Sequence, residues 1–204
     1  MLAVALLVLA GVASVALRGP SDTGTVSTPF LSYTVPDGWV VDGTDAITGE
    51  PTALTGAARG PGYDCDGERY VRGFSAAALL PTDGAVGSGP ADRAERLARW
   101  FAASAYSASR GAAPALDIAP PRPVRVVGPR GLVDGTITEV TVAADNGGTC
   151  RPARGTVLVL AAQVSGGAAV LLVAGDTEGG PAEPPPPDPA ALGRVLESTR
   201  LLQS

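Results

Sequence analysis

Hydrophobic and polar positions alternate with a period of two in residues 30–35, FLSYTV, which predicts a strand with both faces at least partly covered. Pro36-Asp37-Gly38 then predicts a turn, because proline favours the second turn position and glycine favours a position with positive φ. Residues 39–41 lead out of this turn and begin with Trp39, a large apolar side chain. We expect a first hairpin over residues 29–41 with Trp39 as a core anchor; ligand stacking on its ring is the alternative.

The clearest helical period lies in residues 91–109. Apolar residues recur there at helical spacing and form one stripe: Ala94, Leu97, Ala98, Phe101, Ala105 and Ala108. Pro90 suits the first position of such a helix. Arg93, Arg96 and Trp100 lie on a neighbouring face, which is either solvated or binds a partner.

Four strands are predicted in the second half of the chain, at residues 124–127, 132–144, 153–165 and 168–174. Asp145-Asn146-Gly147-Gly148 predicts a hairpin turn after the second of them, and Gly166-Gly167 predicts a two-residue hairpin between the last two. The last two runs are almost continuously apolar, so we expect their sheet to be covered on both faces.

The remaining elements complete the fold class. A strand within residues 68–80 contains Gly73, which predicts a bulge or a close approach of backbone. Residues 176–187 are acidic and rich in proline, which predicts a stiff exposed arm. Asp188-Pro189 then supplies an N-cap and a first-turn proline for a closing helix. The order predicts a single α+β domain over residues 29–204, a mainly antiparallel sheet flanked by helices.

An uncharged hydrophobic run, residues 2–17, precedes this domain. A helix of that length rises about 24 Å, slightly less than the ~30 Å hydrocarbon core of a bilayer. We expect a membrane anchor or signal segment over residues 1–18; a cleaved signal peptide and a buried core helix are the alternatives to a retained anchor. Residues 19–28 are small and polar, which predicts a flexible linker. The expected location is the cell membrane, single-pass with the domain on the outer face, or alternatively the secreted fraction.

The composition excludes much familiar chemistry. All 15 basic residues are arginine, and the chain contains no histidine. Without histidine there is no Ser-His-Asp or Cys-His catalysis, and without lysine there is no Schiff base and no P-loop lysine. A net charge of −5 with dispersed arginines argues against nucleic-acid binding. We therefore expect no catalytic residue, no cofactor, no metal and no nucleic-acid partner.

Cys65 and Cys150 are the only cysteines. An even count behind an export-type segment predicts a disulfide in an oxidising compartment. Two free buried thiols, or a redox or metal role, are the alternatives. Closing a loop of about 85 residues would stabilise the fold by about 4–5 kcal/mol in the chain-entropy account.

Four carboxylates form an acidic neighbourhood in the sequence: Asp37, Asp64, Asp66 and Glu68. Alternating carboxylates suit Ca²⁺, but the complete twelve-residue loop pattern is absent. We expect a solvated turn whose charge Arg69 and Arg72 neutralise, with a cation site or a general acid–base pair as alternatives. Glu139 lies inside a predicted strand and is expected to face outward; burial would raise its pKa.

Several short motifs together resemble a known family. They are Tyr33 with Val35-Pro36-Asp37-Gly38-Trp39, Gly62-Tyr63 with Cys65, Ala98-Arg99-Trp100 with Ala105-Tyr106, Cys150, and Glu197-Ser198-Thr199-Arg200. Over residues 29–202 they resemble an uncharacterised family of exported, often membrane-anchored actinobacterial domains of unknown function. That family is similar in outline to the PsbP-like α/β/α sandwich. The resemblance implies a fold and a location, and no catalytic residues that carry over.

The functional expectation follows from the anchor, the cysteines and the missing catalytic side chains. We expect a non-catalytic interaction or ligand-sensing module of the cell envelope, with an envelope protein or a small ligand as its partner. A carboxylate-dependent envelope hydrolase is one alternative, and it needs two carboxyl groups facing each other roughly 5–10 Å apart. A carrier of a small apolar ligand, held in a pocket between sheet and helix, is the other.

Overall fold

The computed structural model describes residues 24–42, 52–81, 89–107, 113–144 and 149–203. Of these residues, 54% lie in strands and 17% in helices. In chain order the elements are β1 (Thr25–Ser27), β2 (Leu31–Thr34), β3 (Val40–Val41), β4 (Thr55–Arg59), β5 (Gly62–Cys65), β6 (Glu68–Val71), β7 (Gly73–Pro81), α1 (Pro90–Tyr106), β8 (Ala115–Ile118), β9 (Arg122–Gly128), β10 (Gly131–Ala143), β11 (Pro152–Val164), β12 (Gly167–Gly179), α2 (Pro189–Glu197) and β13 (Arg200–Leu201). The predicted N-terminal helix at residues 2–17 and the predicted turn at 145–148 lie outside the described residues.

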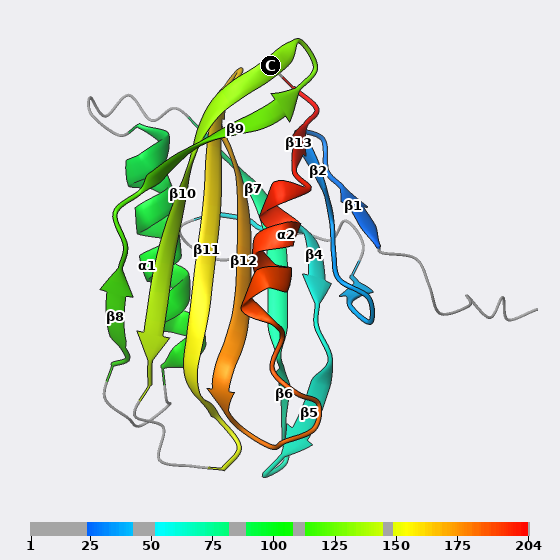
Figure 1. Ribbon diagram of the computed structural model, residues 1–204, viewed down its shortest axis with the longest axis vertical. Helices are drawn as coiled ribbons and strands as arrows, with labels where there is room; N and C mark the ends of the chain where they lie inside the picture. Colours follow the sequence, from blue (N-terminus) through cyan, green and yellow to red (C-terminus); the bar gives the residue numbers. More distant parts are fainter. Residues whose placement is uncertain (1–23, 43–51, 82–88, 108–112, 145–148, 204) are drawn as a thin grey trace, which may run out of the picture.

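The predicted helix-flanked α+β sandwich, including its likeness to the PsbP-like sandwich, is wrong. Most strands join one large sheet in the order β1-β2-β13-β9-β10-β11-β12-β7-β4-β3 (Figure 1). The sheet curls into a nearly closed barrel. Strands near its two ends come together, since the hydroxyl of Tyr33 in β2 donates a hydrogen bond to the carbonyl of Gly56 in β4. The short strand β13 makes this closure possible: Arg200 pairs with Ser32 of β2 and with Val127 of β9, so it links the first strands to the rest.

The long strands β10, β11 and β12 form the centre of the sheet, and both of its faces are covered, as the apolar runs predict. Val157 and Val159 belong to one buried cluster, which includes Ala94, Leu97 and Ala98 of the predicted helical stripe. Leu158 and Leu160 belong to a second cluster, on the inner face of the curl, together with α2. Figure 1 shows the two helices on opposite sides of these strands.

The predicted hairpin over residues 29–41 is also wrong, although its turn forms. The amide of Trp39 donates to the carbonyl of Pro36 at 3.2 Å, and Gly38 has a φ of 80°. However, β2 pairs with β1 and β13, while β3 pairs with β4. Both hydrogen-bonding edges of β2 are therefore occupied by other strands, and the turn directs the chain across the curl to the opposite end of the sheet.

Trp39 is partly buried and packs against the cluster that contains Leu158 and Leu160, which agrees with the expectation that it anchors the core. A Cβ added at Gly73 would lie 2.5 Å from the Trp39 ring, so the predicted close approach at this glycine is confirmed. Neither of the two helices in the described part of the chain is long and apolar enough to cross a membrane.

Candidate functional site

A pocket of about 420 Å³ lies between α1 and the sheet, at the end of the sheet where β6, β7, β11 and β12 meet. Its lining is mostly apolar. The lining residues are Leu54, Arg69, Tyr70, Val71, Arg72, Gly73, Phe74, Trp100, Phe101, Ala105, Tyr106, Arg151, Pro152, Ala174, Gly175 and Asp176. Volume and character both match the range typical of small-molecule sites.

An aromatic cluster forms the wall of the pocket. The rings of Phe74 in β7 and Phe101 in α1 stack with centroids 5.5 Å apart, and Trp100 meets Phe101 edge-on at 6.4 Å. Phe101 belongs to the apolar stripe that the sequence predicts for this helix, whereas Trp100 lies on the neighbouring face. The ring of Trp100 consequently borders a second hollow of about 490 Å³, on the side of Leu80 and Arg96.

The floor of the pocket is polar and almost fully buried. The carboxylate of Asp176 accepts one hydrogen bond from Arg72 and one from the hydroxyl of Tyr106, each at 3.4 Å. Burial raises the pKa of Asp176 to about 6, since it outweighs the opposing effect of the neighbouring Arg72 charge and of the two hydrogen bonds. Burial also raises the pKa of Tyr106, and the negative charge of Asp176 adds to that shift. The floor therefore carries a proton-accepting group whose charge changes in mildly acidic solution.

Arg72 organises this floor. Its side chain is 1% exposed and donates to the carbonyls of Gly179, at 2.8 Å, and Pro184, at 2.9 Å, as well as to the carbonyl of Pro181. Its guanidinium also lies 4.5 Å from the centre of the Tyr63 ring. The segment 176–187, predicted as an exposed arm, is thus held against the domain by one buried cation.

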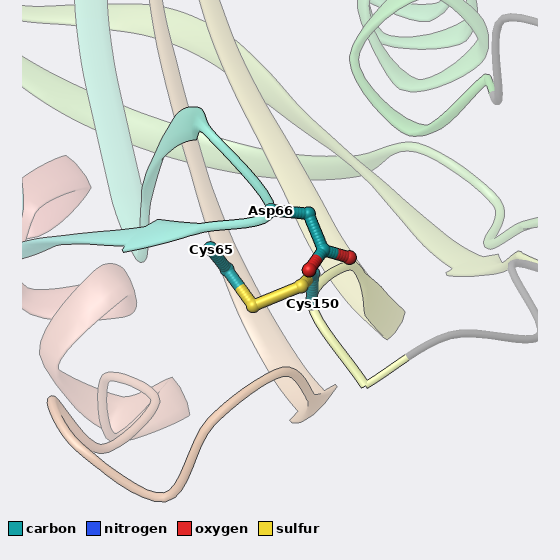
Figure 2. Close-up of side chains that lie close together, drawn as sticks. All are labelled: Cys65, Asp66 and Cys150. Carbon is teal, nitrogen blue, oxygen red and sulfur yellow. A yellow bond between two sulfur atoms is a disulfide. The ribbon is translucent and has the colours of Figure 1, made fainter.

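The disulfide lies next to the pocket. The sulfur atoms of Cys65 and Cys150 are 2.01 Å apart, so the structure forms the predicted bond (Figure 2). It ties the turn between β5 and β6 to the segment before β11, and each side supplies pocket residues, Arg69 to Arg72 on one and Arg151 on the other. Asp66 is near both sulfurs, but these sulfurs are bonded to each other and cannot act as thiolate ligands of a metal.

The rim of the pocket carries charges. Arg69 forms an ion pair with Asp64 at 2.7 Å, and both side chains are well exposed. Glu68 accepts a hydrogen bond from Tyr70 at 2.7 Å and contacts Arg151 at 3.3 Å. The hydrogen bond from Tyr70, and then the charge of Arg151, lower the pKa of Glu68; its hydrogen bond raises the pKa of Tyr70.

None of the five carboxylates considered for catalysis lines this pocket. All five are exposed, and Glu139 faces outward from β10 as expected; the set is Asp37, Asp64, Asp66, Glu68 and Glu139. Arg69 neutralises Asp64 as predicted, whereas Arg72 does not join this group and pairs with Asp176 instead. These five carboxylates therefore contribute nothing to the pocket beside α1.

Sequence reasoning missed Asp176 and Tyr106 as pocket residues. The sequence does contain an indication that Asp176 is buried, because this residue follows closely on the uninterrupted apolar run at residues 168–174. A carboxylate at a buried strand position requires a hydrogen-bond or ion-pair partner. No local signal identifies that partner, which lies 104 positions earlier in the chain.

The fold and the site together define a strand-dominated domain with a mostly apolar pocket that lies beside a disulfide. Residues 21–204 match the family described as a domain of unknown function, DUF8017, and the chain belongs to that family. This confirms the expectation of a family of unknown function; the match carries no information on export or source organism. No curated protein matches the sequence.

Proposed function

We propose that this protein is a non-catalytic, ligand-binding module of the cell envelope that holds a small, mostly apolar molecule in the pocket beside α1. The observation that carries the proposal is the pocket itself, in which an aromatic wall faces a few convergent polar groups in a space of about 420 Å³. The sensing and carrier functions expected from the sequence share this site, and both require reversible binding there.

The chemistry of the lining supports binding rather than turnover. Asp176 is the one carboxylate among the lining residues, and Arg72 and Tyr106 already contact its two oxygens. A general acid or base must come within hydrogen-bond reach of the proton that it transfers. The other titratable lining groups are arginines and tyrosines, which stay protonated at neutral pH. Saturable turnover of any envelope substrate by the purified domain would overturn this part of the proposal.

The disulfide supports an extracytoplasmic location, since such bonds persist in oxidising compartments. We place the domain on the outer face of the membrane, anchored through residues 2–17, or in the secreted fraction. Labelling of intact cells with a membrane-impermeant thiol reagent tests this. Labelling only after reduction supports the external location, and thiols that become reactive only on lysis would overturn it.

Dye binding tests the pocket. The neutral dye N-phenyl-naphthylamine fluoresces in apolar surroundings, and we expect it to bind the purified domain saturably. Three consecutive positions of α1 provide matched variants: Ala105 lines the pocket, Ala103 lines the second hollow, and Ser104 lines neither. Ala105→Phe should weaken dye binding about tenfold or more because the ring fills the mouth, while Ala103→Phe and Ser104→Phe leave it unchanged.

The same series gives the contrary outcomes. Absence of saturable dye binding, or equal loss in all three variants, would overturn the pocket as the binding site. Loss in Ala103→Phe alone would assign binding to the second hollow. A Trp39→Phe background leaves Trp100 as the sole tryptophan, so its quenching by bound dye reports directly on the shared wall.

A further inference from the structure

The charged residues that line the pocket are unequal in sign. Three are arginines, Arg69, Arg72 and Arg151, and one is the carboxylate of Asp176. Arg72 and Asp176 pair with each other in the floor, where their side chains are 1% and 7% exposed. The donors of Arg72 are directed at three backbone carbonyls and at that carboxylate. The floor is therefore internally neutralised, and the two remaining lining arginines lie at the rim, where Asp64 and Glu68, which do not line the pocket, pair with them.

The two rim arginines differ in how firmly they are held. Arg69 makes a short ion pair, 2.7 Å to Asp64, that points to solvent. Three contacts of Arg151 are long: 3.3 Å to Glu68, 3.4 Å to the carbonyl of Ser107, and 6.0 Å to the centre of the Tyr70 ring. The Tyr70 hydroxyl is a further hydrogen-bond partner. Charge-assisted hydrogen bonds are typically about 2.7–2.9 Å long, so a carboxylate at the mouth would make shorter bonds with Arg151 than Glu68 and Ser107 do.

We infer that the pocket accepts an amphipathic monoanion, whose apolar body lies against Phe74, Trp100 and Phe101 and whose acidic head group binds Arg151. This inference rests on the proposed function above and specifies the chemical class of its ligand. The disulfide supports the arrangement, because Cys150 directly precedes Arg151 and fixes its backbone beside the β5–β6 turn. The head group stays at the rim, where water solvates its remaining oxygens, so its desolvation cost is small.

Three competitors with the same hydrocarbon chain test the inference: decanoate, decanol and decylammonium. Each displaces N-phenyl-naphthylamine from the wild-type domain at near-neutral pH, and decanoate should compete best. Arg151→Gln should weaken competition by decanoate about 3- to 10-fold more than competition by decanol, the loss expected for a partly exposed charge-assisted contact. Arg154→Gln is the matched control, because Arg154 forms an exposed ion pair with Glu178 and does not line the pocket.

The outcomes separate this inference from the function on which it rests. If the dye fails to bind the wild-type protein, the proposed function falls. If the dye binds but the three competitors are equivalent, or decylammonium competes best, the monoanion inference is overturned and the pocket stands. Added salt gives a readout that needs no variant: it should weaken decanoate and leave decanol unaffected, and equal behaviour of the two would also overturn the inference.

Discussion

Replacement of Arg72 by methionine is the most informative perturbation of the fold. Methionine keeps much of the apolar length of the side chain and removes the charge and all five donors. The side chain of Arg72 is 1% exposed. Its removal takes one hydrogen-bond donor away from Asp176 and one from each of the carbonyls of Gly179 and Pro184. Removing one member of a buried ion pair typically costs about 3–5 kcal/mol, and we expect a loss of unfolding free energy of that size at neutral pH.

The loss should depend on pH with a definite sign. Burial already raises the pKa of Asp176 to about 6, and the charge of Arg72 limits that rise. Without Arg72 the pKa rises further, so the folded state binds a proton over a wider pH range than the unfolded state, and stability falls as pH increases. Near pH 4 the carboxyl is protonated in the folded state, and this part of the cost disappears; the destabilisation at about pH 8 should exceed that near pH 4 by at least ~1.4 kcal/mol, one unit of pKa.

Urea unfolding of wild type and variant at the two pH values measures this difference. Arg69→Met is the control, because Arg69 is exposed and its pair should contribute less than about 1 kcal/mol. Arg72→Lys keeps the charge and loses the carbonyl contacts, so it should be destabilised with little pH dependence. An Arg72→Met loss that is the same at both pH values would refute the argument that Arg72 stabilises the ionised form of Asp176.

Three further predictions concern the same end of the sheet. Wild-type stability should fall by about 2 kcal/mol as pH rises from about 4 to about 6, because the folded pKa of Asp176 is raised to about 6. Asp176→Asn should remove this slope in urea midpoints measured against pH, and an unchanged slope would assign it to other groups. The double cysteine-to-serine variant should lose about 2–5 kcal/mol and bind N-phenyl-naphthylamine more weakly, since the bond joins two segments of the rim; unaltered dye affinity would show that the rim needs no tether. Gly155→Ala should lower the free energy of unfolding by about 1–3 kcal/mol in thermal or urea unfolding, because the added Cβ would lie 2.0 Å from the Tyr106 hydroxyl. Gly193→Ala is the control: this glycine of α2 has open space around it, so the substitution should stabilise by about 0.5–1 kcal/mol. Similar effects of the two substitutions would contradict the close packing of the Tyr106 ring against Gly155.

The features that the sequence predicts correctly act over a few residues. The helical stripe within residues 91–109 corresponds to α1, and Asp188 caps α2 by accepting a hydrogen bond from the amide of Ala190. A two-residue hairpin joins β11 and β12 as expected, but its loop is Ser165-Gly166, one position earlier than predicted, with a φ of 85° at Gly166. Periodicity, capping and turn conformation depend on neighbouring side chains and backbone, and they can therefore be read from short windows.

Pairings between distant segments were decided only by the tertiary structure. The sequence predicts the strand at residues 30–35 and the turn after it. It does not show that β13, near the C-terminus, pairs with the edge of β2 where residues 39–41 were expected. The same limit hid the pocket, whose floor joins Arg72 to a carboxylate 104 positions away. The sequence of a strand shows which of its faces is apolar, but the strand that pairs with it depends on how the whole sheet closes. In the same way, a charged residue in a buried strand requires an oppositely charged partner, but the sequence does not show which residue that partner is. The sequence by itself thus determined the two helices, the long strands of the second half and the cysteine pair, whereas closure of the sheet decided the short strands, the fold class and the site.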